Sequence, residues 1–244
     1  MPVAVVTGAS SGIGRAVAER LLSDGWSVVA LARRTERLAE FCAGHAGAQA
    51  LGCDVSDPAA VEAAFDLAVA RFGRIDLLFN NAGVFPRPGL IDETATEDWL
   101  RTVSVNLSGM FFCARAAFAR MRRQDPQGGR IINNGSVAAR APRPGAVCYT
   151  VTKHGVKGLT RQLALDGRPF GIACGQIDVG NVQSDLSDQI GRGVTQADGS
   201  IRAEPMMPMA DVVDAVMLMA GMPAAANVLD MTVMATTMPL VGRG

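Results

Sequence analysis

Residues 3–14, VAVVTGASSGIG, lead from an apolar run through a glycine-rich turn into a helical pattern. The apolar run predicts a buried strand, and Val17, Leu21 and Leu22 continue the apolar stripe of a helix. Glycines allow the tight turn and let a pyrophosphate approach the backbone at the positive helix N-terminus. The spacing G-x-x-x-G-x-G therefore favours a nucleotide-binding strand–turn–helix unit, with a purely structural turn as the alternative.

The same turn also matches a second motif. Residues 8–12, GASSG, fit G-x-S-x-G, the nucleophile elbow of serine hydrolases, which likewise joins a strand to a helix. Such an enzyme needs a downstream acid and then a histidine, and His154 is the only histidine in the second half of the chain. Because His154 directly follows Lys153 on a helical pattern, a serine hydrolase is the weaker interpretation.

Short apolar runs alternate with helical patterns along the chain, which is typical of buried strands in a parallel sheet. The runs lie at residues 3–7, 27–31, 50–53, 75–80, 130–134, 172–177 and 228–234. Asp57-Pro58 predicts the start of a helix that runs to about Phe72. Thr94 and Glu97 predict a capping box before the next helix. The alternation predicts an α/β fold with one doubly wound sheet in a single domain.

The composition argues against several classes of protein. The 244 residues are 49% hydrophobic and carry 23 basic and 23 acidic side chains, so the basic excess of a nucleic-acid-binding protein is missing. Five cysteines form no C-x-x-C pair, and neither histidine has a partner at metal-ligand spacing, which predicts a reduced protein without a metal site. No apolar run approaches the roughly 18 residues of a membrane span. We therefore expect a soluble cytoplasmic protein.

Residues 185–207 interrupt the alternation of strands and helices. They contain Gly191, Gly193, Gly199 and Pro205 and show only weak apolar periodicity. A loop of this length inside a compact domain is usually an active-site lid or a disordered segment. We expect a substrate lid.

Tyr149 is the only tyrosine of the chain, and Lys153 is one of its two lysines. Their i, i+4 spacing puts both side chains on one face of a helix. A nearby ammonium lowers the pKa of a tyrosine, which makes Tyr149 a candidate proton donor or acceptor for a carbonyl or an alcohol. Ser136 follows the strand at 130–134, where it can donate a hydrogen bond to a substrate oxygen. For Tyr149 and Lys153 the alternative is a solvent-exposed helix face without a function. For Ser136 the alternative is a serine that only begins a loop.

Together these features resemble the short-chain dehydrogenase/reductase family over roughly residues 3–184. Residues 7–14, TGASSGIG, are similar to the family's cofactor turn, and residues 80–83, NNAG, to its motif after the fourth strand. Its catalytic tetrad is matched by Asn106, Ser136, Tyr149 and Lys153. The resemblance implies a single Rossmann-type domain over residues 1–244, with a mostly parallel seven-stranded sheet flanked by helices. It also disfavours the hydrolase.

The resemblance implies a role for each residue of the tetrad. Tyr149 transfers the proton, and Lys153 lowers the tyrosine pKa and binds the nicotinamide ribose. Ser136 orients the substrate oxygen, and Asn106 holds a water in the proton relay. The implied cofactor site consists of Gly8, Ser10, Ser11, Gly12, Ile13, Gly14, Arg33, Arg34, Asp54, Val55, Asn81, Ala82, Gly83, Tyr149, Lys153, Gly180, Val182 and Ser184.

Two arginines, Arg33 and Arg34, end the second strand at the position where an enzyme that selects NAD usually carries an acid. A carboxylate there would repel a 2′-phosphate, whereas guanidinium groups bind phosphate through paired hydrogen bonds. The sequence therefore favours NADP(H) over NAD(H), with Arg33 as the closer contact and Arg34 assisting. The alternative is a pair of solvated arginines at the sheet edge.

The implied function is that of an NADP(H)-dependent carbonyl reductase or alcohol dehydrogenase acting on a small-molecule ketone or secondary alcohol. A cofactor-binding sensor or scaffold with little turnover is the alternative. The resemblance also implies a homotetramer, with helices around 99–122 and 150–166 between subunits. Val179-Gly180 stands where the family usually has Pro-Gly, so the pocket entrance is expected to differ. The residues considered for an apolar substrate pocket are Val84, Phe85, Pro86, Val137, Cys148, Met206, Met207 and Met209.

Overall fold

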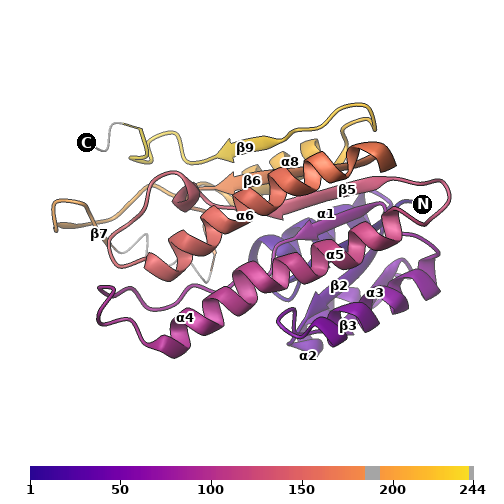
Figure 1. Cartoon of the computed structure of the whole chain (residues 1–244), viewed down its shortest axis with the longest axis horizontal. Coiled ribbons are helices and arrows are strands. Elements are labelled where there is room, and N and C mark those ends of the chain that lie inside the picture. The colour runs from indigo at the N-terminus through magenta and orange to yellow at the C-terminus, as the bar shows by residue number, and fades with distance from the viewer. Residues whose placement is uncertain (185–192, 242–244) are drawn as a thin grey trace.

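The computed structural model describes residues 1–184 and 193–241, and a seven-stranded sheet forms its centre (Figure 1). Neighbouring strands are parallel throughout, in the order β3-β2-β1-β4-β5-β6-β9. The strands are β1 (Val3–Thr7), β2 (Ser27–Ala32), β3 (Ala48–Gly52), β4 (Leu77–Asn80), β5 (Gly129–Asn134), β6 (Ile172–Val179) and β9 (Asp230–Val233). The predicted α/β fold with a mostly parallel seven-stranded sheet is confirmed.

Some predicted strand boundaries are wrong, and hydrogen bonding explains one of them. β3 begins at Ala48, two residues before the apolar run that predicted it. β4 begins at Leu77 although the apolar run starts at Ile75. The Ile75 backbone is paired with the Gln124 side chain, which accepts from its N–H and donates to its carbonyl at 2.9 Å each. Ile75 therefore contributes to the core without joining the sheet ladder.

Helices cover both faces of the sheet, and alternate residues of each strand serve the two layers. The helices are α1 (Gly12–Ser23), α2 (Thr35–Cys42), α3 (Pro58–Phe72), α4 (Thr96–Val103), α5 (Met110–Met121), α6 (Val147–Asp166) and α8 (Met209–Ala220). Val6 of β1 packs in the core with α1, α2 and α8, whereas Val5 packs in the opposite core with α3 and α5. Burial on both faces explains why the strands read as continuous apolar runs.

The helix starts show which capping prediction was right. Asp57 caps α3 by accepting a hydrogen bond from Ala59 N at 2.9 Å, Pro58 takes the first helical position and Phe72 ends the helix, as predicted. The capping box at Thr94 is wrong, because α4 begins at Thr96 after the N-cap Ala95. Thr94 instead donates its hydroxyl hydrogen bond back to the Leu90 carbonyl at 2.9 Å, which closes the preceding turn.

Residues 96–121 form one long helical stretch with an irregular middle. A π-helical segment, η1 (Ser104–Gly109), joins α4 directly to α5. Gly109 packs against Val55, which follows β3 in the chain, and a Cβ at Gly109 would lie 2.8 Å from a Val55 methyl carbon. Single π-helical turns occur frequently at functional sites. No described helix is long and apolar enough to cross a membrane.

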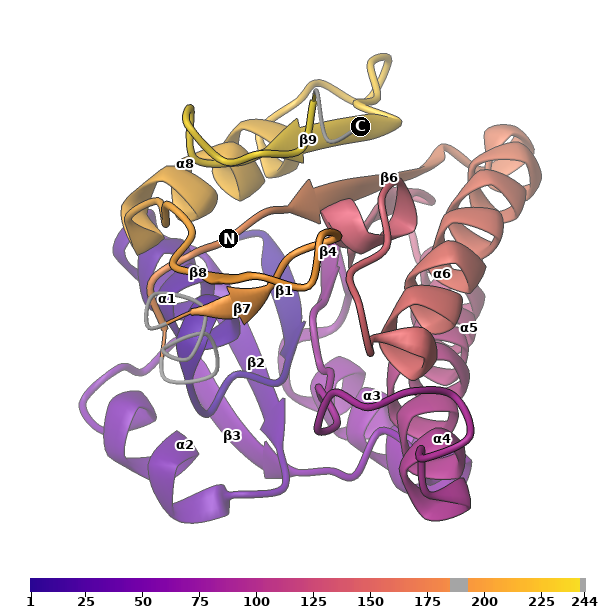
Figure 2. The same cartoon turned by 90° about the vertical axis from the view of Figure 1, so that its left-hand side faces the viewer.

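Part of the predicted lid has regular structure that the sequence did not predict. Strands β7 (Val194–Thr195) and β8 (Ile201–Arg202) form a small antiparallel hairpin. Figure 2 shows this hairpin, in orange, near the start of α1. Residues 185–192 of the predicted lid lie outside the described residues.

The close approach of α1 to the strand ends predicts a specific cost of adding one methyl group. A Cβ at Gly14 would lie 2.5 Å from both the Gly8 carbonyl oxygen and Asn81 Nδ2. Gly14→Ala should therefore lower the free energy of unfolding by about 1–3 kcal/mol, measured by urea denaturation. Gly158 of α6 is the matched control, since a Cβ there meets nothing within 4 Å. Gly158→Ala should raise that free energy by about 0.5–1 kcal/mol, and equal effects would contradict the prediction.

Candidate active site

A cavity of about 570 Å³ opens at the carboxyl ends of the central strands. The order of the sheet reverses between β1 and β4, and ligands of open α/β sheets bind at such a reversal. The predicted site residues in its wall are Gly8, Ser10, Ser11, Gly12, Ile13, Arg33, Arg34, Asp54, Val55, Asn81, Ala82, Gly83, Ser136, Tyr149, Lys153, Gly180, Val182 and Ser184. Gly14 and Asn106 stand behind the wall.

The glycine-rich turn forms one end of the cavity. Gly8 and Gly12 have φ angles of +67° and +55°, in the left-handed region that favours glycine. A Cβ at Gly12 would meet no described atom within 4 Å, so the space above the helix start is open. This open space beside the first N–H groups of α1 fits the phosphates of a dinucleotide. Gly14, by contrast, is required for packing against Gly8 and Asn81.

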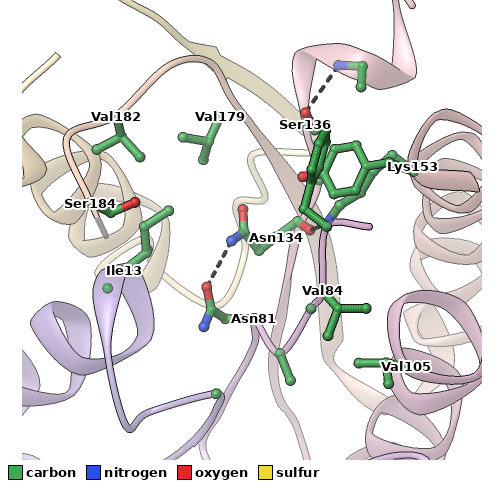
Figure 3. Close-up of a pocket in the computed structure, with 18 of the residues that line it drawn as sticks. Ile13, Asn81, Val84, Val105, Asn134, Ser136, Lys153, Val179, Val182 and Ser184 are labelled. Atoms are coloured by element: carbon green, nitrogen blue, oxygen red, sulfur yellow. Dashed lines mark hydrogen bonds between the residues drawn. The ribbon is translucent and has the colours of Figure 1, made fainter. Parts of the chain in front are cut away.

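Side chains tie the ends of three strands together beneath this turn. Thr7 Oγ1 accepts hydrogen bonds from the backbone N–H groups of Asn81 and Ala82 at 2.8 and 2.9 Å. Asn81 Nδ2 donates to the Thr7 carbonyl at 3.0 Å, and Asn81 Oδ1 accepts from Asn134 Nδ2 at 2.8 Å (Figure 3). The floor of the cavity is therefore a fixed network that joins β1, β4 and β5.

The two arginines after β2 face different partners along the cavity. Arg34 donates to Ser10 Oγ at 3.0 Å and to Ser11 Oγ at 2.8 Å, so its guanidinium lies against the glycine-rich turn. The charge of Arg33 contributes to a lowered pKa of Asp54, after the larger effect of the hydrogen bond from Ser56. Both guanidinium groups therefore lie at the end of the cavity that is next to the carboxyl end of β2.

Tyr149 lies in the cavity wall between an aromatic ring and an ammonium. Its ring centroid is 4.8 Å from that of Phe85 and 5.3 Å from Lys153 Nζ. Lys153 donates to the Asn134 carbonyl at 2.7 Å, which holds the buried ammonium below the ring, and burial lowers the pKa of Lys153 to about 8. Tyr149 and Lys153 share one helix face, as their spacing predicted.

Burial raises the pKa of the Tyr149 hydroxyl above its ordinary value. The hydrogen bond with Ser136 and the positive charge of Arg143 oppose this rise, and the negative charge of Asp178 adds to it. The expected lowering of this pKa by Lys153 is not among these effects, and the Lys153 ammonium donates to the Asn134 carbonyl. The net rise favours the phenol of Tyr149 over its phenolate.

Asn106 is fully buried in η1, and both polar atoms of its side chain bind one residue. Oδ1 accepts from Val84 N at 2.7 Å, and Nδ2 donates to the Val84 carbonyl at 2.8 Å. Asn106 thus fixes the segment that follows Gly83 against the long helical stretch.

Sequence reasoning missed a group of polar residues that hold the hairpin at the cavity. The carboxylate of Glu204, only 2% exposed, binds Arg143 at 2.5 Å. It also accepts from Asn181 Nδ2 at 2.8 Å and from Gln196 Nε2 at 3.1 Å. A lone glutamate in a segment with weak periodicity gives no signal in the sequence, because its partners are distant along the chain.

Of the residues considered for the apolar pocket, Val84, Phe85 and Val137 line the cavity, whereas Pro86, Cys148, Met206, Met207 and Met209 do not. Met207 is buried in the core with α1 and α8, and Met209 packs against the same core. The apolar residues that do line the cavity are Val84, Phe85, Pro88, Val105, Val137, Ala138, Ala141, Pro144, Val194 and Ile201. The wall is apolar near Tyr149, as predicted, but loops and the hairpin supply it.

The geometry argues against the serine hydrolase. Ser10 Oγ accepts a hydrogen bond from Arg34, so its neighbour is a cation rather than a base. His154 is exposed on α6, and its Nδ1 lies 2.9 Å from the Thr150 carbonyl. The histidine does not line the cavity, so no serine–histidine pair forms with Ser10.

Comparison with known proteins agrees with this geometry. Residues 2–194 match the family described as short chain dehydrogenase. A 3beta-hydroxysteroid dehydrogenase of Mediterraneibacter gnavus is 36% identical, over 85% of this chain and 75% of that protein. A 2-(R)-hydroxypropyl-CoM dehydrogenase of Xanthobacter autotrophicus is 35% identical, over 90% and 91% of the two chains.

A solved structure shows the same fold over nearly the whole chain. The 3-ketoacyl-(acyl-carrier-protein) reductase of Brucella melitensis, complexed with NADH, superposes with a TM-score of 0.85 and 27% identity. The superposition covers 97% of this chain and 98% of that one. The chain therefore belongs to the short-chain dehydrogenase family of oxidoreductases.

Proposed function

We propose that this protein is an NADP(H)-dependent carbonyl reductase or alcohol dehydrogenase for a small-molecule ketone or secondary alcohol. One observation carries the proposal: a single cavity joins the glycine-rich turn and its two arginines to Tyr149, Ser136 and Lys153. The relatives support the reaction class, since one is named a hydroxysteroid dehydrogenase and another a hydroxypropyl-CoM dehydrogenase. The Brucella neighbour, complexed with NADH, supports a nicotinamide cofactor.

The cofactor-binding residues predicted from the sequence fit a dinucleotide that lies along the cavity. The open space at Gly12 would take the phosphates, and Arg33 and Arg34 would take a 2′-phosphate at the end of β2. Asp54 and Val55 would hold the adenine. The loop with Gly180, Val182 and Ser184 would hold the nicotinamide side. When bound, a reduced nicotinamide supplies hydride to the substrate carbon.

The protein's own residues would manage the oxygen of the substrate. Ser136 and the Tyr149 hydroxyl bind this oxygen, and Tyr149 donates its proton as negative charge develops there. Lys153 attracts the phenolate that remains. The side chain of Asn106 is already engaged with Val84, so any relay water would be held by the Asn106 backbone within η1. In alcohol oxidation the same groups act in reverse.

The location and assembly complete the proposal. We place the protein in the cytoplasm as a homotetramer, without a nucleic-acid or membrane partner. The apolar residues exposed on the helical stretch and on α6 support burial between subunits, and they include Leu100, Phe111, Val151 and Leu165. The segment 185–207, which includes the hairpin, would act as the substrate lid.

Replacement of the proposed proton donor is the central test. Tyr149→Phe keeps the ring against Phe85 but removes the hydroxyl. Turnover of NADPH with a panel of ketones and aldehydes should fall by about 10²- to 10⁴-fold, because general acid catalysis contributes that much. Cofactor affinity, measured by fluorescence, should remain the same. Turnover like that of the wild type would contradict the assignment, and a wild type that binds cofactor without turnover would indicate a sensor.

Cofactor selectivity tests the two arginines separately. The wild type should prefer NADPH to NADH in kcat/KM. Arg33→Ala and Arg34→Ala should each reduce this preference by about tenfold, since each removes a charge-assisted hydrogen bond to the 2′-phosphate. Arg33 is predicted to be the closer contact, so its replacement should have the larger effect. A preference for NADH in the wild type, or a ratio that neither substitution changes, would overturn the NADP assignment.

The mass in solution tests the proposed assembly. Light scattering at micromolar concentration should give about four times the chain mass of 25.5 kDa. Phe111→Glu and Leu100→Glu, which add charge to exposed apolar positions, should reduce that mass. A wild type that scatters with the mass of one chain would refute the tetramer.

A further inference from the structure

Asn134, the last residue of β5, has a buried amide oxygen without a hydrogen-bond partner. In the part of the chain that the structure describes, four buried side-chain atoms lack a partner, and they belong to Gln49, Asn134, Thr150 and Thr232. Among these four residues only Asn134 lines the cavity, where it is 8% exposed. Because buried polar groups are normally hydrogen-bonded, an unpartnered acceptor in the cavity wall requires an explanation.

The neighbouring side chains fix the direction in which this amide group faces. Asn81 Nδ2 donates to the Thr7 carbonyl at 3.0 Å, so Asn81 presents its oxygen to Asn134. Asn134 Nδ2 donates to that oxygen at 2.8 Å. A flipped Asn134 amide would place two acceptor oxygens against each other. The amide oxygen of Asn134 is therefore held on the side away from Asn81, as Figure 3 shows.

The other contacts of Asn134 place this oxygen along the cavity. Its side-chain nitrogen binds Asn81, which lies beneath the glycine-rich turn. Its backbone carbonyl accepts from Lys153 Nζ at 2.7 Å, beside the ring of Tyr149. Asn134 thus lies between the end of the cavity that fits phosphates and the end that holds the tyrosine (Figure 3).

The chemistry of the unpartnered atom limits what can bind it. An amide oxygen only accepts, so its partner must be a donor. The phosphates of a dinucleotide are acceptors at neutral pH and cannot serve. The nicotinamide ribose follows the phosphates along the cofactor, and its hydroxyl groups are donors. A donor that binds Asn134 recovers the free energy that the protein loses by leaving this acceptor unpaired.

We propose that Asn134 is a cofactor-binding residue, whose amide oxygen accepts a hydrogen bond from a hydroxyl group of the nicotinamide ribose. The inference rests on the proposed function, in which a nicotinamide dinucleotide lies along the cavity. The two ends of one amide group then have separate tasks. The nitrogen supports the loop after β4 through Asn81, and the oxygen binds the cofactor.

Asn134→Ala removes the amide group and keeps the backbone carbonyl that binds Lys153. The two ligands for calorimetric titration are 2′-phospho-ADP-ribose and 2′-phospho-ADP, which differ in the second ribose and carry no nicotinamide. The substitution should weaken the binding of 2′-phospho-ADP-ribose by about fivefold, the effect of one hydrogen bond. The affinity for 2′-phospho-ADP should stay the same, since this ligand lacks the proposed donor.

The ligand pair separates binding from structural support. Equal losses for both ligands would mean that Asn134 acts only by supporting the glycine-rich turn through Asn81, and would overturn the proposal. Unchanged affinities for both ligands would overturn it as well. A loss with NADP⁺ but not with 2′-phospho-ADP-ribose would assign the contact to the nicotinamide, and the ribose proposal would fail.

Thr232→Val is the matched control for the loss of an unpartnered oxygen. Thr232 Oγ1 is also buried without a partner, but Thr232 belongs to β9 and does not line the cavity. Its replacement should leave both affinities unchanged. Should Asn134→Ala not fold, Asn134→Leu keeps a similar side-chain volume and is measured instead. The same selective loss is expected, and equal changes for both ligands would again overturn the proposal.

The wild type separates this inference from the proposed function. If it binds both ligands but reduces no carbonyl, the proposed function fails and the binding data still decide the role of Asn134. If it prefers NADH, the NADP assignment fails, and ADP-ribose and ADP should show the same difference. In an active enzyme, Asn134→Ala should raise KM for NADPH by about fivefold with kcat nearly unchanged, because the contact is made equally before and during the reaction. A lower kcat with an unchanged KM would contradict a binding role.

Discussion

The contact between the start of α1 and the loop after β4 is the constraint on which the site depends. At Gly8 and Gly14 the backbone comes so close to Asn81 and Ala82 that a methyl group would not fit. This approach brings the helix N-terminus to the point where the strand order reverses. The parallel ladder of β1, β4 and β5 then aligns the carboxyl ends of these strands at that point.

Most of the fold could be predicted because burial on two faces leaves a clear signal. Each central strand must be apolar on both sides, so the runs at β1, β2 and β5 were found within one residue of their ends. One error lies where a side chain replaces a ladder bond, as Gln124 does at Ile75. The hairpin β7–β8 was also missed, because two-residue strands held by one pairing leave no periodicity.

The residues of the candidate site also fall into those that the sequence could predict and those that it could not. Residues on the glycine-rich turn and on α6 were predictable, because a local spacing brings their functional groups together. Asp178, Arg143 and Glu204 were not, since each acts through partners that only the tertiary structure brings near. Asp178 lies just after the apolar run that predicted β6, and its buried carboxylate is surrounded by Gly135 and three donors.

The carboxylate of Glu204 connects the hairpin to two loops of the cavity wall. It joins the hairpin residue Gln196, the loop after β6 through Asn181, and the loop before α6 through Arg143. Breaking one hydrogen bond to a buried charge costs considerable free energy, because the charge then has fewer partners in an environment without water. The loss of any one of these contacts would leave the buried charge of Glu204 with fewer partners. The hairpin, the loop after β6 and the loop before α6 are therefore stabilised together, because all three share one carboxylate.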